Sequence, residues 1–280
     1  MRLVKSHGIG NDYLVLASNH IIDGDVVRAL CHRNTGIGGD GVLEAIPSDV
    51  ADFGLRIWNP DGSVAEKSGN GLRIFARYLV DHCLAPLVFT IEVGGSIVGC
   101  EVHASGQEVT VAMGQATLSA PAIPATRALV QGTIEVCGQA LTATAVGIGN
   151  PHCVVFVDAL LGPNSDLDAL PWRAWGAALE VHPWFPNRTN VQFVRVVDAS
   201  TLELRVWERG AGETLASGSS ACAATVAAFV AGYVAGSVQV CMPGGTLAVT
   251  VNDTLDVVLR GPVEEVAVIA TSRTFGEKAG

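Results

Sequence analysis

The sequence is short of positive charge and of long apolar runs, and each shortage excludes a class of partner. Lysine and arginine number 17 against 27 aspartates and glutamates, which gives a net charge of −10. A nucleic-acid surface needs clustered basic side chains to neutralise phosphates, so we expect no nucleic-acid partner. No apolar run reaches the ~18 uninterrupted residues of a membrane-spanning helix, so we expect no membrane partner either.

The sequence also lacks any pairing pattern among its cysteines. There are seven, an odd number, and no C-x-x-C pair occurs. Neither a disulfide framework nor a zinc ribbon is therefore predicted, and no metal site is expected. We interpret the cysteines as mostly buried small apolar residues in a reducing compartment. Because Met1–Gly8 turns polar and glycine-rich too early for a signal peptide, we expect a cytoplasmic location.

What is present is a folded, rather apolar chain with room for two domains. Its 280 residues are 49% hydrophobic and 16% charged, which excludes a disordered chain. The glycine-rich stretch Asn34–Gly41 is not followed by Gly-Lys-Ser/Thr or by a helix pattern. It is therefore neither a P-loop nor a dinucleotide-binding turn.

An internal duplication organises the chain. An Arg-x-Trp strand followed by a Ser-Gly turn occurs in Arg56–Gly71 and again, offset by 149 positions without a gap, in Arg205–Ser220. A second pair, Gly8–Asn11 and Gly147–Asn150, shares the letters Gly-Ile-Gly-Asn at an offset of 139. Repeated units of this kind predict two pseudo-equivalent halves.

Hydrophobic periodicity predicts the same kinds of element in each half. Helices are expected over 23–33, from Ser68 to about Val80, over 166–178 and over 221–233. The last has no charged residue and must be buried on every side. Strands are expected over 4–7, 13–16, 42–46, 53–58, 89–93, 97–102, 109–113, 128–136, 141–146, 154–157, 190–196 and 201–206.

These elements predict an α/β (α+β) fold of two pseudo-symmetric halves, each a curled, mostly antiparallel sheet around a central helix. We place the first half at residues 1–117 plus about 264–280, and the second at 118–263. Free amides at a helix N-terminus, with the positive end of its dipole, suit a carboxylate. Ser68 is equally explained as a simple N-cap.

Several motifs occur along the chain in the order His7–Asp12, Ser68–Gly71, Gly149–His152, Glu208–Thr214 and Ser217–Ser219. In these motifs, and in their order, the chain resembles the diaminopimelate epimerase family over essentially its full length. The resemblance implies the two-half fold with a site in the cleft between the halves. It also implies an amino-acid isomerase of lysine biosynthesis that needs neither pyridoxal phosphate nor a metal, acts on a small amino-acid substrate such as diaminopimelate, and is a homodimer.

The resemblance further implies roles for individual residues. Those matching the cradle of the reacting carbon's carboxylate are Gly69, Asn70, Gly218 and Ser219. Those matching the site for the distal end of the substrate, with Asn11 also lining the pocket, are Asn59, Asn150, Asn190, Glu208 and Arg209. The planar guanidinium of Arg209 suits a carboxylate, and Glu208 suits an ammonium group.

The sequence departs from the family at the two reacting positions. Members of the family use one cysteine on each face of the α-carbon, and this chain has Ser68 and Ser217 there. A helix N-terminus can hold a thiol as thiolate near neutral pH. A hydroxyl is a far weaker acid, and each unit of pKa adds about 1.4 kcal/mol to forming the base.

Four functions are compatible with these serines. The protein is an epimerase whose cysteines were replaced by design, or a natural member that performs another isomerisation or elimination. In the second case His152 or Glu208 is the candidate base. Alternatively, it binds an amino acid without chemistry, or it epimerises slowly through Ser68 and Ser217.

Overall fold

The computed structural model describes residues 1–17, 22–161 and 166–271. The chain divides into two compact units, Met1–Ala112 with Gly261–Gly280, and Met113–Arg260. It passes between them within β8 (Glu108–Gln115) and β17 (Asp256–Pro262). The sequence placed both boundaries a few residues further along the chain.

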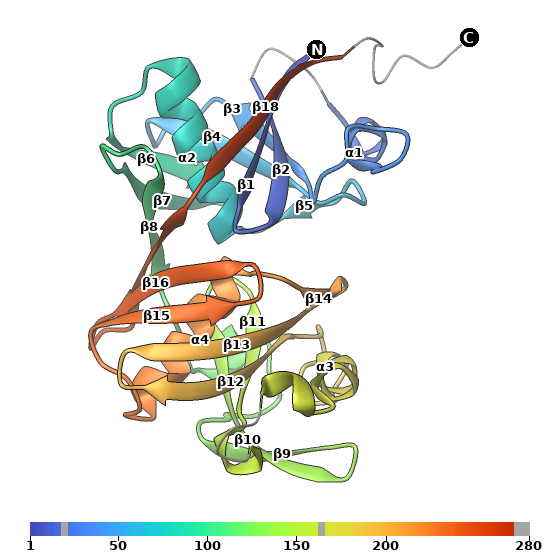
Figure 1. Cartoon of the computed structure of the whole chain (residues 1–280), viewed down its shortest axis with the longest axis vertical. Helices are drawn as coiled ribbons and strands as arrows, with labels where there is room; N and C mark the ends of the chain where they lie inside the picture. The colour runs from blue at the N-terminus through green and yellow to red at the C-terminus, as the bar shows by residue number, and fades with distance from the viewer. Residues whose placement is uncertain (18–21, 162–165, 272–280) are drawn as a thin grey trace. The chain divides into compact units, whose positions relative to one another are not determined.

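In the first unit a mixed sheet curls around α2 (Gly69–Cys83), as Figure 1 shows. Neighbouring strands run in the order β18, β1, β2, β3, β4, β6, β7, β8, parallel at β2–β3 and β4–β6. Helix α2 packs against β1, β2 and β7, near the two ends of that order, so the sheet wraps it. The strands not yet given bounds are β1 (Arg2–Gly8), β2 (Asn11–Leu16), β3 (Val42–Ile46), β4 (Phe53–Trp58), β5 (Val64–Ala65), β6 (Val88–Val93), β7 (Ser96–Val102) and β18 (Glu264–Ala270).

The second unit wraps a sheet around α4 (Gly218–Val230) in the same way. Its order is β9, β10, β11, β12, β13, β15, β16, β17, parallel at β11–β12 and β13–β15. The strands are β9 (Gly132–Val136), β10 (Gln139–Gly147), β11 (Pro151–Phe156), β12 (Asn190–Asp198), β13 (Thr201–Glu208), β14 (Gly212–Thr214), β15 (Ser237–Met242) and β16 (Gly245–Val251).

The two units therefore share one sequence of pairings. In each, a hairpin is followed by a parallel step, an antiparallel step and a second parallel step that crosses over through the central helix. This agreement confirms the α/β fold of two curled halves that the duplication predicts.

The central helices differ in how they are buried. Leu72, Phe75 and Leu79 of α2 are buried at helical spacing, which the sequence pattern predicts. Every side chain of α4 over 220–228 is buried. Strands β10–β13, β15 and β16 all contact α4, so this uncharged helix is buried as the sequence predicts.

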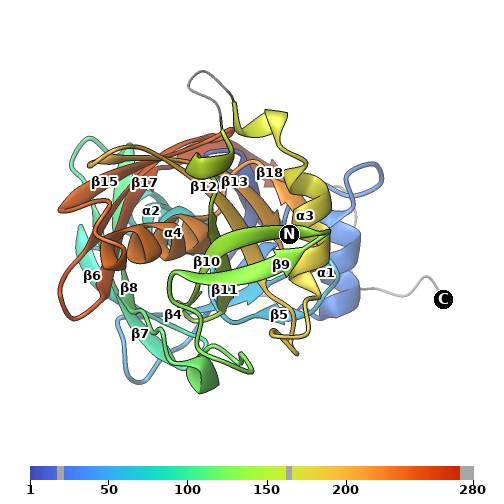
Figure 2. The ribbon, with the colours of Figure 1, turned by 90° about the horizontal axis from the view of Figure 1, so that it is seen from below.

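Two further helices cover the other faces of the sheets. Helix α1 (Gly24–Cys31) begins after Asp23, which accepts the Val26 amide at 3.0 Å, and packs on residues of β1, β2 and β3. Helix α3 (Trp172–Glu180) contacts β12 and β13 on the side away from α4 (Figure 2). The described 3₁₀ turns are η1 (Ala120–Ala122), η2 (Asp158–Leu160) and η3 (Leu167–Ala169).

Two sequence-based expectations for the second unit are wrong at their edges. The helix expected from Asp166 is a 3₁₀ turn capped by Asp166, and α3 begins only at Trp172. Pro171 explains the interruption, because it holds Leu170 extended, at ψ 151°. The strand expected from Ala128 begins at Gly132, because Gln131 has φ +47°. No helix in the described residues is long and apolar enough to cross a membrane.

Candidate active site

The two central helices begin with the same local backbone. Ser68 precedes Gly69 with φ −139° and ψ 119°, and Ser217 precedes Gly218 with φ −146° and ψ 122°. Both serines are N-cap residues in extended conformation, so the amides of the following turn are left unpaired by the helix itself. Each helix start is therefore a local site for a carboxylate oxygen.

The hydroxyl of Ser68 receives two hydrogen bonds. The Gly71 amide donates to Ser68 Oγ at 3.0 Å, and the Tyr13 hydroxyl donates to the same atom at 3.2 Å. Gly71 has little room for a side chain, since an added Cβ would lie 3.0 Å from Leu43. Two donors on one oxygen favour negative charge on it, which is useful to a proton-abstracting group.

Ser217 has a different environment at its side chain. It is 6% exposed, and its hydroxyl makes no capping hydrogen bond with the first turn of α4 in the described chain. Its carbonyl accepts the Ala221 amide at 3.0 Å, which starts the helix. The two serines therefore match in backbone and differ in side-chain bonding.

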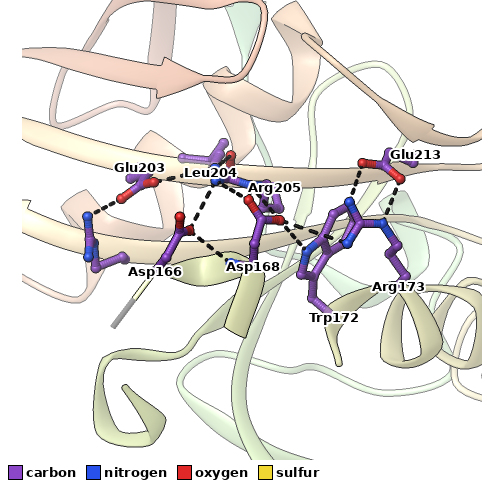
Figure 3. Close-up of polar contacts among 9 residues, drawn as sticks. Asp166, Asp168, Trp172, Arg173, Glu203, Leu204, Arg205 and Glu213 are labelled. Atoms are coloured by element: carbon purple, nitrogen blue, oxygen red, sulfur yellow. Dashed lines mark hydrogen bonds and ion pairs between the residues drawn. The ribbon is translucent and has the colours of Figure 1, made fainter. Parts of the chain in front are cut away.

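Strand β14, which leads into Ser217, is fastened by ion pairs to α3 (Figure 3). Glu213 accepts two hydrogen bonds of 2.7 Å from Arg173 on α3. Next to this pair, Arg205 of the repeated Arg-x-Trp segment binds Asp168 at 2.7 Å and Asp166 at 3.2 Å. These bonds hold α3 and the turn before it against β13 and β14, and so support the approach to α4.

In the first unit, four polar side chains are linked by consecutive hydrogen bonds. Arg73, fully buried on α2, donates to Asn70 Oδ1 at 2.8 Å, and Asn70 Nδ2 donates to Asn11 Oδ1 at 3.2 Å. Asn11 Nδ2 in turn donates to Asp40 at 2.8 Å. Asn11 and Asn70, which the family resemblance assigns to substrate binding, are thus brought together. Asn59 lies apart, at the end of β4, where its Nδ2 donates to Ser63.

The Asp12 carboxylate, next to Asn11, has two basic neighbours. Asp12 contacts Lys5 at 2.9 Å and Arg33 at 2.8 Å. Burial opposes its ionisation, but the hydrogen bonds from Arg33 and Lys5 outweigh that cost, so the pKa of Asp12 lies below its usual value. Arg33 also binds Asp40 at 2.7 Å, so it links the two carboxylates that flank Asn11.

In the second unit the loop Glu208–Gly210 is pinned from two sides. Asn190 Oδ1 accepts the Arg209 amide at 2.9 Å, and Asn190 Nδ2 donates to Pro151 O at 3.0 Å. Glu180 accepts the Gly210 amide at 2.9 Å and the indole N–H of Trp207 at 2.8 Å. Three residues that the resemblance assigns to the distal end of a substrate, Asn190, Glu208 and Arg209, are therefore adjacent.

Glu180 is ionised at ordinary pH. Burial opposes this, but the hydrogen bonds from Trp207 and Gly210 and the charge of Arg188 outweigh it, and the pKa of Glu180 lies below its usual value. The first unit has a comparable arrangement, in which Glu44 accepts the Trp58 indole N–H at 2.8 Å. Each repeated tryptophan is thus satisfied by a carboxylate, from β3 in one unit and from α3 in the other.

Asn150 ends the second copy of the Gly-Ile-Gly-Asn turn, and His152 follows two residues later. His152 is fully buried, with its Nε2 2.8 Å from Asn150 Oδ1 and its Nδ1 3.0 Å from Gln192 Nε2. Burial, and to a smaller extent the positive charge of Arg209, lower the pKa of His152 to about 3. The assignment of His152 as a base stays a prediction, and a neutral ring is what this environment favours.

Comparison with known proteins identifies the family. The family model described as diaminopimelate epimerase matches residues 3–119 and 144–266. The chain belongs to the diaminopimelate epimerase family. It is 42% identical to diaminopimelate epimerase 2 of Nostoc over 275 residues, 95% of this chain and 94% of that protein. It is 39% identical to the diaminopimelate epimerase of Desulfitobacterium hafniense over 278 residues, 94% of this chain and 95% of that protein.

Solved structures show the same fold at much lower identity. A probable proline racemase from Agrobacterium radiobacter superposes with a TM-score of 0.74 at 12% identity, covering 99% of this chain and 94% of that one. A hydroxyproline epimerase from Agrobacterium vitis gives a TM-score of 0.71 at 15% identity, covering 96% and 91%. Membership of the diaminopimelate epimerase family places the chain in the isomerase class of enzymes.

Several residues that organise these sites were not predicted from the sequence. Tyr13, Arg73, Glu180 and Gln192 each make a buried or half-buried hydrogen bond to a predicted site residue or to its loop. Tyr13 and Gln192 lie within apolar strand patterns, so only their partners, which are distant in sequence, reveal them. Glu180 carries no sequence signal for its bond to the Gly210 amide.

Proposed function

We propose that the chain is a cofactor-independent isomerase that acts at the α-carbon of diaminopimelate or a close analogue. The observation that carries this is the matched pair of helix starts after Ser68 and Ser217, with N-cap angles that agree within 7°. The amides that follow them, at Gly69, Asn70, Gly218 and Ser219, bind the carboxylate of the reacting carbon. A carboxylate is stabilised there by free N–H groups and by the helix dipole.

The loop Glu208–Gly210 and several asparagines bind the second amino-acid group, at the distal end of the substrate. Arg209 binds the distal carboxylate through its planar guanidinium, and Glu208 binds the distal ammonium group. Asn59, Asn150 and Asn190 complete the polar contacts, with Asn11 beside the reacting end. A substrate with charges of both signs at each end matches this set better than a monocarboxylic amino acid does.

Ser68 and Ser217 occupy the positions of the acid and base in this proposal. Negative charge on Ser68 Oγ is supported by Tyr13 and by the Gly71 amide. A hydroxyl nevertheless has a much higher pKa than a thiol. Each unit of pKa difference lowers the rate of proton abstraction by about tenfold. We therefore expect slow turnover from the chain as it stands.

The test is exchange of the substrate α-proton in deuterated water, followed by NMR, with LL- and meso-diaminopimelate. We expect slow deuterium incorporation with inversion, and a rise of at least about tenfold when Ser68→Cys and Ser217→Cys are combined. Ser105→Cys with Ser237→Cys, at one exposed serine in each unit, is the matched control and leaves the rate unchanged. The proposal is wrong if calorimetry shows that the doubly substituted variant binds diaminopimelate but NMR shows no exchange.

A second function is favoured by the two serines themselves. Because both helix starts are kept and both thiols are missing, a protein that binds the amino acid without converting it is also consistent with the site. Saturable binding with no exchange in the unaltered chain selects this function. A new alkene or keto product selects instead an isomerisation or elimination that uses another base, Glu208 or His152.

We also propose, from the family resemblance, that the protein is a cytoplasmic homodimer in lysine biosynthesis. Light scattering of the purified chain tests the dimer, which a mass near the 29.0 kDa of one chain excludes. Rescue of a bacterial strain that requires added diaminopimelate tests the pathway. We expect the variant that combines Ser68→Cys and Ser217→Cys to rescue growth more strongly than the unaltered chain does.

A further inference from the structure

A closed polar group lies inside the second unit, between β11, β12 and α4. His152 and Gln192 sit on the adjacent parallel strands β11 and β12, and Ser220 sits in the first turn of α4. All three side chains are 0% exposed. Gln192 Nε2 lies 3.0 Å from His152 Nδ1 and 3.0 Å from Ser220 Oγ, and His152 Nε2 lies 2.8 Å from Asn150 Oδ1.

The orientations of the Asn150 and Gln192 carboxamides indicate which nitrogen of the ring carries the proton. Asn150 Oδ1 can only accept, so His152 Nε2 must donate to it. Nδ1 of the neutral ring is then an acceptor, and it receives one N–H of the Gln192 amide. The second N–H of that amide goes to Ser220 Oγ, so both amide hydrogens are used.

The reversed orientation of the Gln192 carboxamide, with its oxygen and nitrogen exchanged, is less favourable. Gln192 Oε1 is buried and has no hydrogen-bond partner in the described residues. If the amide were reversed, its two N–H groups would point to that partnerless position. Two unsatisfied donors would replace one unsatisfied acceptor, and each buried unsatisfied group costs about 1–3 kcal/mol.

The surroundings keep the ring neutral. Helix α4 and strand β10 contain no charged residue, and β11 contains none besides His152 itself. Arg209 is the charge that acts on the ring, and its sign disfavours an imidazolium. Burial and the arginine charge therefore work in the same direction.

We propose that Gln192 fixes His152 as the neutral Nε2–H tautomer, and that His152 thereby holds the Asn150 carboxamide with its NH₂ group turned away from the ring. His152 is then a positioning residue for Asn150. This deepens the proposed function and rests on it in one respect: the ligand group that meets Asn150 is a hydrogen-bond acceptor, such as a carboxylate oxygen, and not an ammonium group.

The tautomer can be measured without any ligand. The full chain is labelled with ¹⁵N-histidine, and long-range ¹H–¹⁵N correlation spectra are recorded from pH 5.5 to 8, with His152→Gln used to assign the signal. We expect a single Nε2–H pattern that does not change with pH. An Nδ1–H pattern, or an imidazolium in this range, overturns the proposal whatever the fate of the proposed function.

Substitutions at Gln192 separate positioning from a general structural role. Gln192→Leu removes the donor to Nδ1, so both tautomers are expected, together with about tenfold weaker diaminopimelate binding. Ser220→Ala is the matched control, because it removes the other partner of the same amide and leaves the single tautomer in place. A single unchanged tautomer in the Gln192→Leu variant overturns the role of Gln192.

A second variant keeps the test decisive if the leucine variant does not fold. Gln192→Glu replaces the donor facing Nδ1 with an acceptor, so His152 is expected to carry a proton on Nδ1. Failure of that proton to appear contradicts the proposal. If the unaltered chain binds no diaminopimelate, the proposed function fails, while the tautomer measurements still decide the state of His152.

Discussion

Asn190 joins two segments through one carboxamide: its Oδ1 accepts the Arg209 amide at 2.9 Å while its Nδ2 donates to Pro151 O at 3.0 Å. The side chain is 7% exposed, so neither bond is readily replaced by water. The strand that carries His152 and the loop that carries Arg209 are thus held by the same residue. A role for Asn190 in ligand binding would act partly through this placement of Arg209.

Asn190→Ala is expected to lower the free energy of unfolding by about 2 kcal/mol and to weaken ligand binding. The stability loss arises because the buried Pro151 carbonyl and the part-buried Arg209 amide lose their partner. Urea denaturation and calorimetry measure the two effects. Asn187→Ala, at an exposed position three residues earlier, is the control and should change neither. An Asn190→Ala variant as stable as the control would show that Asn190 does not hold the loop.

Glu180 is expected to make stability depend on pH. Its folded-state pKa lies below the usual value, so its contribution is present above the unfolded-state pKa and is lost as pH falls through the folded-state pKa. Glu180→Gln should therefore flatten the acid side of a stability profile measured by urea denaturation between about pH 3 and 7. The control, Glu135→Gln at an exposed position, should keep the acid-side slope of the unaltered chain.

Tyr13 should tune the reactivity of the group at position 68. In a Ser68→Cys background, the Tyr13 hydroxyl is expected to stabilise a thiolate as it now bonds the serine oxygen. Adding Tyr13→Phe should raise the pH midpoint of alkylation of that new thiol by iodoacetamide. Tyr233→Phe, in the other unit, leaves the midpoint where it was. An equal midpoint in all three proteins would remove Tyr13 from the site.

Gly176 gives a packing test of the support behind the Arg209 loop. A Cβ at Gly176 on α3 would lie 2.8 Å from two atoms of Trp207, whose indole bonds Glu180. Gly176→Ala should cost about 1–3 kcal/mol of unfolding free energy, since α3 must shift from β13. Gly99→Ala, whose added Cβ would meet only Ala112 at 3.8 Å, is the control. Equal stability of the two variants would contradict the tight contact.

Periodicity and the duplication together predicted most of the fold. The Ser68-Gly69 turn located the start of α2, and alternation located strands such as β4 and β13. The helix expected over 221–233 was placed three residues too late, since α4 begins at Gly218, directly after the second Ser-Gly turn, and ends at Val230. The late start of α3 was missed, because a polar-apolar pattern continues across Pro171 although the backbone cannot. The strands after α4 were not assigned individually from the sequence and came only with the structure.

The site was predictable only as far as the family resemblance reached. The fold pairs Asn11 with Asn70 in the first unit and Asn190 with the Arg209 amide in the second. Sequence could not reveal that Gln192 bonds His152, because the pairing arises from two parallel strands 40 positions apart in the chain. The sequence therefore suggested His152 as a candidate base, although in the fold it is fully buried and hydrogen-bonded at both ring nitrogens.

The discontinuity of the first unit has a consequence for how the chain is made. Strand β1 pairs with β2 on one side and with β18, residues 264–270, on the other. The ribosome therefore releases the whole of Met113–Arg260 before the last strand of the first unit exists. We infer that the later-encoded unit is the first whose sheet can be completed during synthesis, and that β1 waits with an open edge until residues 264–270 have been synthesised.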